Sequence, residues 1–180
     1  RANPPNADQL AAFRRWRARL PAAKASFANS AGIFLGPDYH ADLVRPGASL
    51  YGLAPLADES NPMMQVIRLQ GKILQIRFVD SGMTVGYGAT HRFTRPSRLA
   101  TVAVGYGDGW SRASSNRAGA LVRGVRVPLV GTVAMDAVMA DVTDVPGPEV
   151  GVDDEFVLIG EQGDERITAL DVARARTTIS

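Results

Sequence analysis

The 180-residue sequence contains no cysteine, which excludes a disulfide scaffold, a thiolate metal site and a cysteine nucleophile. Its only lysines are Lys24 and Lys72, which limits covalent chemistry that depends on a lysine amine. Its only histidines, His40 and His91, lie too far apart in the sequence to pair on one helix or strand. The acidic run Asp153-Asp154-Glu155 is typical of a solvated turn, so we expect no metal site.

The sequence also lacks an apolar run long enough to span a membrane. Its start, Arg1-Ala2-Asn3-Pro4-Pro5, has no apolar core of the kind found in signal peptides. We therefore expect a cytoplasmic protein that does not enter the membrane. There is no G-x-S-x-G motif for a serine hydrolase, and Gly105-Tyr106-Gly107-Asp108-Gly109 does not fit the G-x-G-x-x-G pattern of a dinucleotide loop.

The composition is that of an ordinary globular protein. Apolar residues make up 46% of the chain and charged residues 21%, with a net charge of +2. This excludes disorder as the main description and suits one domain or two small ones. A basic stripe occurs only at Arg14, Arg15, Arg17 and Arg19. Trp16 stands between these arginines but falls at the spacing of the helix's apolar face, so no base-stacking aromatic residue shares the arginine face; we expect a solvated helix face and no nucleic-acid partner.

Hydrophobic periodicity divides the chain into an α/β part and a β part. In the first part we expect a helix with Asn6 as its N-cap, an apolar face and an end at Pro21; the apolar residues are Leu10, Phe13, Trp16 and Leu20. A strand over 25–28, a turn and short helix over 29–35, and a strand over 42–47 follow. This strand, turn and helix order is the unit of a parallel α/β layer. One helix and two strand–turn units are too few to close a barrel. Residues 1 to about 55 therefore resemble the end of an α/β fold and not a whole one.

From Met63 onward the pattern predicts short strands separated by glycine and proline, as in a β-sandwich or barrel-like domain. We expect strands over 65–69, 72–79 with Gly71 between them, 99–104, 128–131, 138–142 and 156–159. A hairpin is expected over 120–127 around Arg123-Gly124. One last helix is expected over 169–174, with Thr168 and Asp171 as a capping box.

Three local motifs carry groups that could take part in binding or catalysis. Two tyrosines, Tyr87 and Tyr106, each lie between glycines, and bare flanks leave a phenol open to a ligand. The stretch Asn29 to Gly32 places a hydroxyl and backbone N–H groups at a helix start, which suits a phosphate but also simple helix capping. Arg45 ends a short strand, where α/β folds place functional groups, although it could also be a surface partner of Asp42.

Taken together, six stretches resemble, in order and nearly in spacing, the C-terminal half of bacterial alanine racemases, which are fold-type III enzymes that use pyridoxal 5′-phosphate. They are residues 28–32, 44–53, 85–90, 103–109, 130–136 and 154–160. The resemblance implies an α+β chain in which residues 1–57 are the last segments of a (β/α)8 barrel. Residues 58–180 would then be a mainly antiparallel β domain. It further implies a homodimer in which the β domain of one subunit completes the barrel site of the other.

The same resemblance implies roles for individual residues. Tyr87 resembles the catalytic tyrosine, one of two bases that serve opposite faces of the substrate alanine. Arg45 resembles the arginine that faces the pyridine nitrogen of the cofactor. Ser30, Gly47 and Ala48 resemble the phosphate cradle. Three further residues resemble the substrate-side wall that the family's β domain contributes to the partner's site; they are Tyr106, Met135 and Asp136.

The resemblance also has departures. The family's cofactor lysine lies in a K-A-N-A-Y-G-like stretch that this sequence does not contain, and Lys24 does not align with it. We therefore expect a piece of a racemase that holds one of its two bases and is inactive alone. A racemase for another amino acid, such as serine or lysine, stays open. So does a stand-alone, non-catalytic β module that binds a partner or a phosphate-bearing ligand.

Overall fold

The computed structural model describes residues 4–56 and 59–178. The chain divides into two compact units, Arg1–Val66 and Ile67–Ser180. The domain boundary expected between residues 57 and 58 lies outside the described residues, as do the first three residues and the last two. Within the described part of the chain, no helix is both long and apolar enough to cross a membrane.

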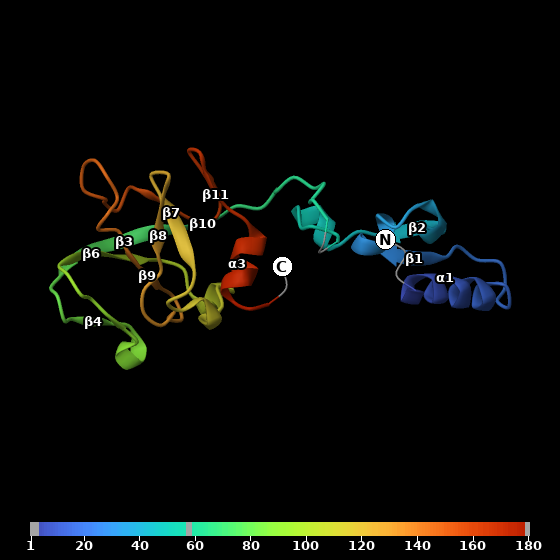
Figure 1. Ribbon diagram of the computed structural model, residues 1–180, viewed down its shortest axis with the longest axis horizontal. Coiled ribbons are helices and arrows are strands. Elements are labelled where there is room, and N and C mark those ends of the chain that lie inside the picture. The colour runs from blue at the N-terminus through green and yellow to red at the C-terminus, as the bar shows by residue number, and fades with distance from the viewer. Residues whose placement is uncertain (1–3, 57–58, 179–180) are drawn as a thin grey trace. The chain divides into compact units, whose positions relative to one another are not determined.

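Unit 1 is a small α/β layer (Figure 1). Its elements are α1 (Pro4–Arg17), β1 (Ser26–Asn29), α2 (Ser30–Ile33), η1 (Pro37–Tyr39), β2 (Leu43–Arg45) and η2 (Ala48–Tyr51), the η elements being 3-10 helices. The two strands pair in parallel. This confirms the predicted strand, turn and helix order, and it brings the carboxyl ends of β1 and β2 to one edge.

Helix α1 begins earlier and ends earlier than the sequence predicts. It starts at Pro4, so Asn6 lies inside the helix and is not its N-cap. Proline suits the first turn because its φ is fixed near the helical value and its missing N–H would have no partner there. Leu10 is buried, and the ring of Phe13 stacks on Phe27 at 4.6 Å between centroids. Trp16 is 57% exposed, so the expected apolar face is only partly covered within the described residues.

Unit 2 is built on a seven-stranded sheet with the order β8-β7-β10-β3-β6-β9, and β11 pairs with β10. The strands are β3 (Leu69–Val79), β6 (Ser97–Val102), β7 (Gly119–Val122), β8 (Val125–Pro128), β9 (Val138–Asp141), β10 (Glu155–Gln162) and β11 (Glu165–Ile167). A separate pair is formed by β4 (Thr84–Val85) and β5 (His91–Arg92). The helical elements are η3 (Tyr87–Ala89), η4 (Tyr106–Asp108), η5 (Arg112–Ser114) and α3 (Ala169–Ala175).

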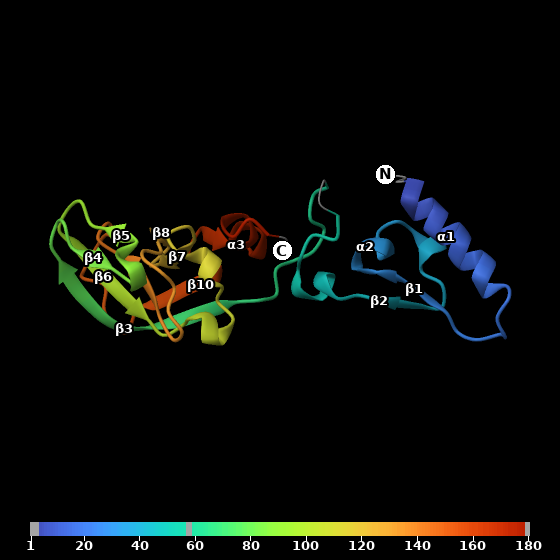
Figure 2. The same ribbon diagram turned by 90° about the horizontal axis from the view of Figure 1, so that it is seen from below.

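All pairings in this sheet are antiparallel, and Figure 2 shows β3 as its long strand. Leu129, just after β8, bridges Ala140 of β9. The two end strands of the order therefore meet, and the sheet curls around its core. Trp110, Phe156 and Ile73 are among the largest fully buried side chains of that core. The predicted α+β class with a mainly antiparallel, barrel-like β domain is confirmed.

Two predicted strands of unit 2 need correction. Strands over 65–69 and 72–79 were expected with Gly71 between them, but residues 65–68 form no strand, and the single strand β3 begins at Leu69 and runs through Gly71. A Cβ on Gly71 would lie 2.5 Å from Cγ1 of Val102 on the neighbouring β6, so this glycine serves close strand packing and not a turn. The expected strand over 128–131 is also wrong, because Pro128 ends β8 and Gly131 has a φ of +80°. The pair β4 and β5, and strand β11, were not predicted.

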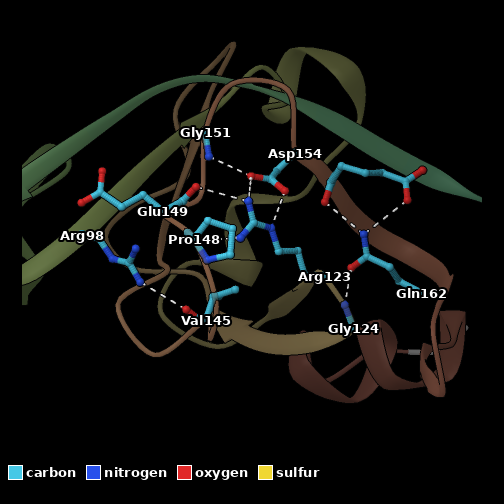
Figure 3. Close-up of polar contacts among 10 residues, drawn as sticks. Arg98, Arg123, Gly124, Val145, Pro148, Glu149, Gly151, Asp154 and Gln162 are labelled. Atoms are coloured by element: carbon cyan, nitrogen blue, oxygen red, sulfur yellow. Dashed lines mark hydrogen bonds and ion pairs between the residues drawn. The ribbon is translucent and has the colours of Figure 1, made fainter.

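The hairpin predicted around Arg123-Gly124 is confirmed as β7–β8, with φ values of +52° and +74° at the two turn residues. Arg123 forms a two-pronged ion pair with Asp154, at 2.6 Å and 2.7 Å (Figure 3). It also donates to the carbonyl oxygens of Pro148 and Glu149. One side chain thereby fixes the long connection from β9 to β10 against the hairpin.

The Arg123 guanidinium holds the pKa of the Asp154 carboxyl below its ordinary value, and the backbone N–H of Gly151 acts in the same direction against the opposing effect of burial. The pair therefore stabilises unit 2 at neutral pH. That contribution is lost as the pH falls through the lowered pKa of the carboxyl.

Helix α3 begins with the predicted capping box: Thr168 accepts a hydrogen bond from the N–H of Asp171, and Asp171 accepts one from the N–H of Thr168. At its other end, Thr178 N–H donates to the carbonyl of Ala173 and Thr177 N–H donates to that of Arg174. These two bonds form a Schellman motif, in which the residue after the cap adopts the left-handed conformation. That residue is Thr177, with a φ of +55°, a position that favours glycine.

We expect Thr177→Gly to raise the free energy of unfolding by about 1 kcal/mol, because a β-branched residue is strained at positive φ. Equilibrium urea unfolding of the chain measures the change. Thr177→Ala is the matched control, since it removes the same side-chain oxygen but keeps a Cβ at positive φ. Equal stability of the two variants would contradict the expectation.

Candidate functional sites in the two units

The first candidate site lies at the edge of unit 1 where β1 and β2 end. Arg45 is the last residue of β2, and its guanidinium donates to the hydroxyl of Ser26 at 2.5 Å and to the carbonyl of Phe27 at 3.2 Å. Asp42 is instead paired with Arg17 at 2.7 Å, so the alternative of an Arg45–Asp42 surface pair is wrong. Arg45 is thus tethered by the neutral oxygens of Ser26 and Phe27 and not by a carboxylate.

Ser30 is the first residue of α2 and is 8% exposed. Its Oγ atom receives the N–H of Gly47 at 2.8 Å, the N–H of Ser49 at 3.3 Å and the hydroxyl of Ser49 at 3.2 Å. A hydroxyl oxygen has two lone pairs, so these three donors exceed what it can accept. Ala48 follows Gly47 as the first residue of η2, where a helical N–H has no acceptor in its own helix. The structure thus brings Ser30, Gly47 and Ala48 together around a surplus of donors.

Beside this cluster lies a hollow of about 270 Å³ within unit 1. Its lining includes Arg45, Phe27, Asn29 and Tyr39, but neither Ser30 nor Gly47. The Asn29 side chain caps α2 by accepting from the N–H of Gly32 at 2.9 Å. Capping and a donor cluster therefore coexist in the stretch 29–32, and the two predicted interpretations are not exclusive.

The second candidate site lies in unit 2, on the segment 131–136. The backbone of this segment binds η4, because Tyr106 N–H donates to the carbonyl of Ala134 at 3.0 Å and Gly107 N–H donates to that of Met135 at 2.9 Å. A Cβ on Gly105 would lie 2.1 Å from the Met135 carbonyl oxygen, so only glycine permits this approach. Tyr106 and Met135, expected to act together, are brought together, and Asp136 follows on the same segment.

The loop that carries Tyr87 is held by the same segment. Gly86 and Gly88 have φ values of +78° and +75°, and a Cβ on Gly86 would lie 2.7 Å from the N atom of Thr132. The Thr132 hydroxyl donates to the carbonyl of Tyr87 at 2.8 Å. The Tyr87 side chain itself is 73% exposed. This exposure agrees with the expectation that bare glycine flanks leave the phenol open.

Two family models match the chain: "Alanine racemase, N-terminal domain" over residues 1–55 and "Alanine racemase, C-terminal domain" over residues 66–180. The chain belongs to the alanine racemase family. An alanine racemase of Rhodospirillum rubrum is 49% identical over 164 residues, which is 84% of this chain and 44% of that protein. A catabolic alanine racemase of Mesorhizobium japonicum is 44% identical over 181 residues, 93% of this chain and 47% of that protein.

Among solved structures, the alanine racemase of Bartonella henselae with covalently bound pyridoxal phosphate matches with a TM-score of 0.85 and 42% identity. The match covers 99% of this chain and 48% of that one. The alanine racemase of Streptomyces coelicolor matches with a TM-score of 0.88 and 32% identity, covering 99% and 48%. The chain therefore spans about half the length of the alanine racemases that it matches.

The residues that hold the Tyr87 loop are not predicted from the sequence. Thr90 and Thr132 stand in stretches that resemble the family, but no local feature assigns them a partner. Asn116 has a φ of +56°, and asparagine in a polar turn is a signal for such a conformation. That signal says nothing about which residues its amide contacts.

Proposed function

We propose that the native protein containing this chain is an alanine racemase that interconverts L- and D-alanine with pyridoxal 5′-phosphate, in the cytoplasm, and supplies D-alanine for peptidoglycan. Residues 1–57 are the last segments of its cofactor-binding barrel and residues 58–180 are its β domain. The single observation that best supports the proposal is the arrangement of Tyr87 and Tyr106, which are held on one backbone segment with Met135 and Asp136 and present exposed phenols.

The residues of unit 1 fit the cofactor. The donors around Ser30 outnumber the lone pairs of its oxygen, and a phosphate oxygen is an acceptor that such a cluster can take. Ser30, Gly47 and Ala48 would hold the phosphate through hydroxyl and backbone N–H groups. Arg45 would face the pyridine nitrogen and donate a hydrogen bond without giving up a proton, because a guanidinium stays protonated.

When bound, pyridoxal phosphate supplies an electron sink that makes the α-proton of the amino acid acidic. Arg45 would weaken that sink, because a guanidinium donates a hydrogen bond to the ring nitrogen without giving up its proton, and this would disfavour side reactions such as transamination. Tyr87 removes or returns the α-proton on one face, and a lysine outside this sequence serves the other. Tyr106, Met135 and Asp136 form the substrate-side wall. In a homodimer, this wall and Tyr87 complete the site of the partner subunit.

The test uses the native protein at full length, incubated with pyridoxal phosphate and reduced with borohydride. We expect the intact mass to rise by one cofactor, with the adduct on a lysine other than Lys24 or Lys72, and we expect alanine to racemise. An adduct on Lys24 or Lys72, or no adduct and no racemisation, would contradict the proposal. Assays with serine and lysine decide between alanine and the other substrates left open by the sequence.

A further inference from the structure

The loop that carries Tyr87 is attached to the rest of unit 2 by a chain of side-chain hydrogen bonds. The Thr132 hydroxyl donates to the Tyr87 carbonyl at 2.8 Å, and the hydroxyls of Thr132 and Thr90 lie 3.2 Å apart. The amide nitrogen of Asn116 donates to the Thr90 hydroxyl at 3.1 Å. Two side chains from distant parts of the sequence, Thr132 and Asn116, thus hold the Tyr87 loop, one at the Tyr87 carbonyl and the other through Thr90, which ends the same turn.

The chemistry of these groups fixes which atom donates in each hydrogen bond of the series from Asn116 to Tyr87. The N–H of Gly131 donates at 2.6 Å to the Asn116 amide, so the atom it meets must be the oxygen, and the nitrogen must face Thr90. Thr132 has one hydroxyl proton, which it gives to the Tyr87 carbonyl. Thr90 must therefore donate its own proton to Thr132. All donors point toward Tyr87, and aligned hydrogen bonds of this kind reinforce one another.

Asn116, at the other end of this series of hydrogen bonds, is held by the packed part of unit 2. Asn116 adopts a left-handed conformation that asparagine tolerates, and one residue, Ser115, separates it from η5. Ser114 of η5 is fully buried, and its hydroxyl accepts from the Nε atom of Arg176 at 2.9 Å. Ser115 accepts from the N–H of Val133 at 2.9 Å, on the same segment as Thr132. The attachment point is therefore part of the packed structure.

At the Tyr87 end of these hydrogen bonds, Gly86 and Gly88 flank the tyrosine at positive φ, and glycine by itself restrains the backbone less than any other residue. We propose that Thr132, Thr90 and Asn116 are positioning residues, which set the place of the Tyr87 phenol through its backbone carbonyl. This inference rests on the proposed role of Tyr87 in proton transfer. A displacement of about 1 Å at a reacting group can lower a rate up to about 100-fold, so such an anchor matters even though it touches no substrate.

The test measures exchange of the α-hydrogen with solvent deuterium, from each alanine enantiomer separately, in the full-length holoenzyme. Thr132→Val removes the hydroxyl and keeps the shape. We expect it to slow exchange from the enantiomer served by Tyr87 about tenfold, and exchange from the other less than about twofold. Thr132→Ser restores the hydroxyl and should restore the rate.

Thr90→Val breaks the chain one link earlier, so we expect a smaller loss in the same direction. In the Thr132→Val background the Thr90→Val change should slow exchange further, and again from one enantiomer only, because Thr90 ends η3 on the Tyr87 loop and its bond to Asn116 holds that loop without Thr132. Thr143→Val is the matched control: its hydroxyl accepts from the N–H of Arg98 at 2.8 Å and donates to Asp141, away from the Tyr87 loop. It should lower stability without any preference for one enantiomer.

Thr132→Val losses that are equal for both enantiomers, or that Thr132→Ser does not reverse, would overturn the inference, and so would a further loss in the double variant that is equal for both enantiomers. If Thr132→Val does not fold, Thr90→Val alone decides by the same asymmetry. Tyr87→Phe is measured in parallel. An asymmetric loss there with symmetric losses in the threonine variants refutes only the positioning role. A symmetric result for Tyr87→Phe refutes the proposed function of Tyr87 and the inference with it.

Discussion

Replacing Tyr87 with phenylalanine is expected to slow removal of the α-proton from one enantiomer of alanine by about 10²–10⁴-fold, the usual contribution of a positioned acid–base group. Removal from the other enantiomer should change little, because the second base is untouched. The substitution deletes one oxygen from a side chain that is 73% exposed, so the fold should be unaffected.

The measurement must be hydrogen exchange and not net racemisation. The equilibrium constant between L- and D-alanine is one, so kcat/KM must fall equally in both directions whichever base is lost. Exchange of the α-hydrogen with deuterated solvent, followed for each enantiomer by NMR, is not bound by this equality. Tyr51→Phe removes the same oxygen from an exposed tyrosine of unit 1 and serves as the control. Small, equal losses for both enantiomers would show that Tyr87 is not a base.

Replacing Gly105 with alanine is expected to lower the free energy of unfolding by about 3 kcal/mol, which is at the upper end for an added methyl group. The backbone conformation of Gly105, with φ −149° and ψ −166°, is open to any residue, so the cost is purely steric. The added Cβ would meet the Met135 carbonyl oxygen at 2.1 Å and that of Ala134 at 2.5 Å. These are backbone atoms that cannot rotate away, so η4 must separate from the segment 131–136.

Urea unfolding of the variant and of the parent chain measures this loss. Gly151→Ala is the matched control, since a Cβ there has nothing within 4 Å and no positive φ is involved. It should leave stability within about 0.5 kcal/mol of the parent. If Gly105→Ala matched Gly151→Ala, η4 would not be pressed against Met135 in solution.

Local signals were sufficient for much of the fold. The β7–β8 hairpin and the capping box of Thr168 and Asp171 were predicted, because turn and cap chemistry act between residues a few positions apart. Gly71 was wrongly predicted to break the strand. Glycine is needed there because Val102, on another strand, leaves no room for a Cβ. The start of α1 was misplaced because two signals competed there, a good N-cap residue and a proline, and the proline decided.

In the candidate sites, too, local features could be predicted from the sequence and contacts between distant residues could not. Glycines beside Tyr87 indicated an open phenol, and the geometry agrees. That the Tyr87 carbonyl is bound by Thr132, 45 residues further along the chain, could not be predicted, because nothing in either sequence neighbourhood encodes the contact. The catalytic and binding roles of the individual residues rest on the resemblance and remain the predictions tested above.

The central position of β3 also determines when unit 2 can fold as it is synthesised. One edge of β3 pairs with β6, but its other edge pairs with β10, where Lys72 lies opposite Glu155. Until β10 has left the ribosome, β3 presents an unpaired edge beside an incomplete core, which is the situation in which strands pair with the wrong partner. The unit is therefore made almost entirely before it can close, and a ribosome that stalls ahead of β10 releases a chain prone to aggregation.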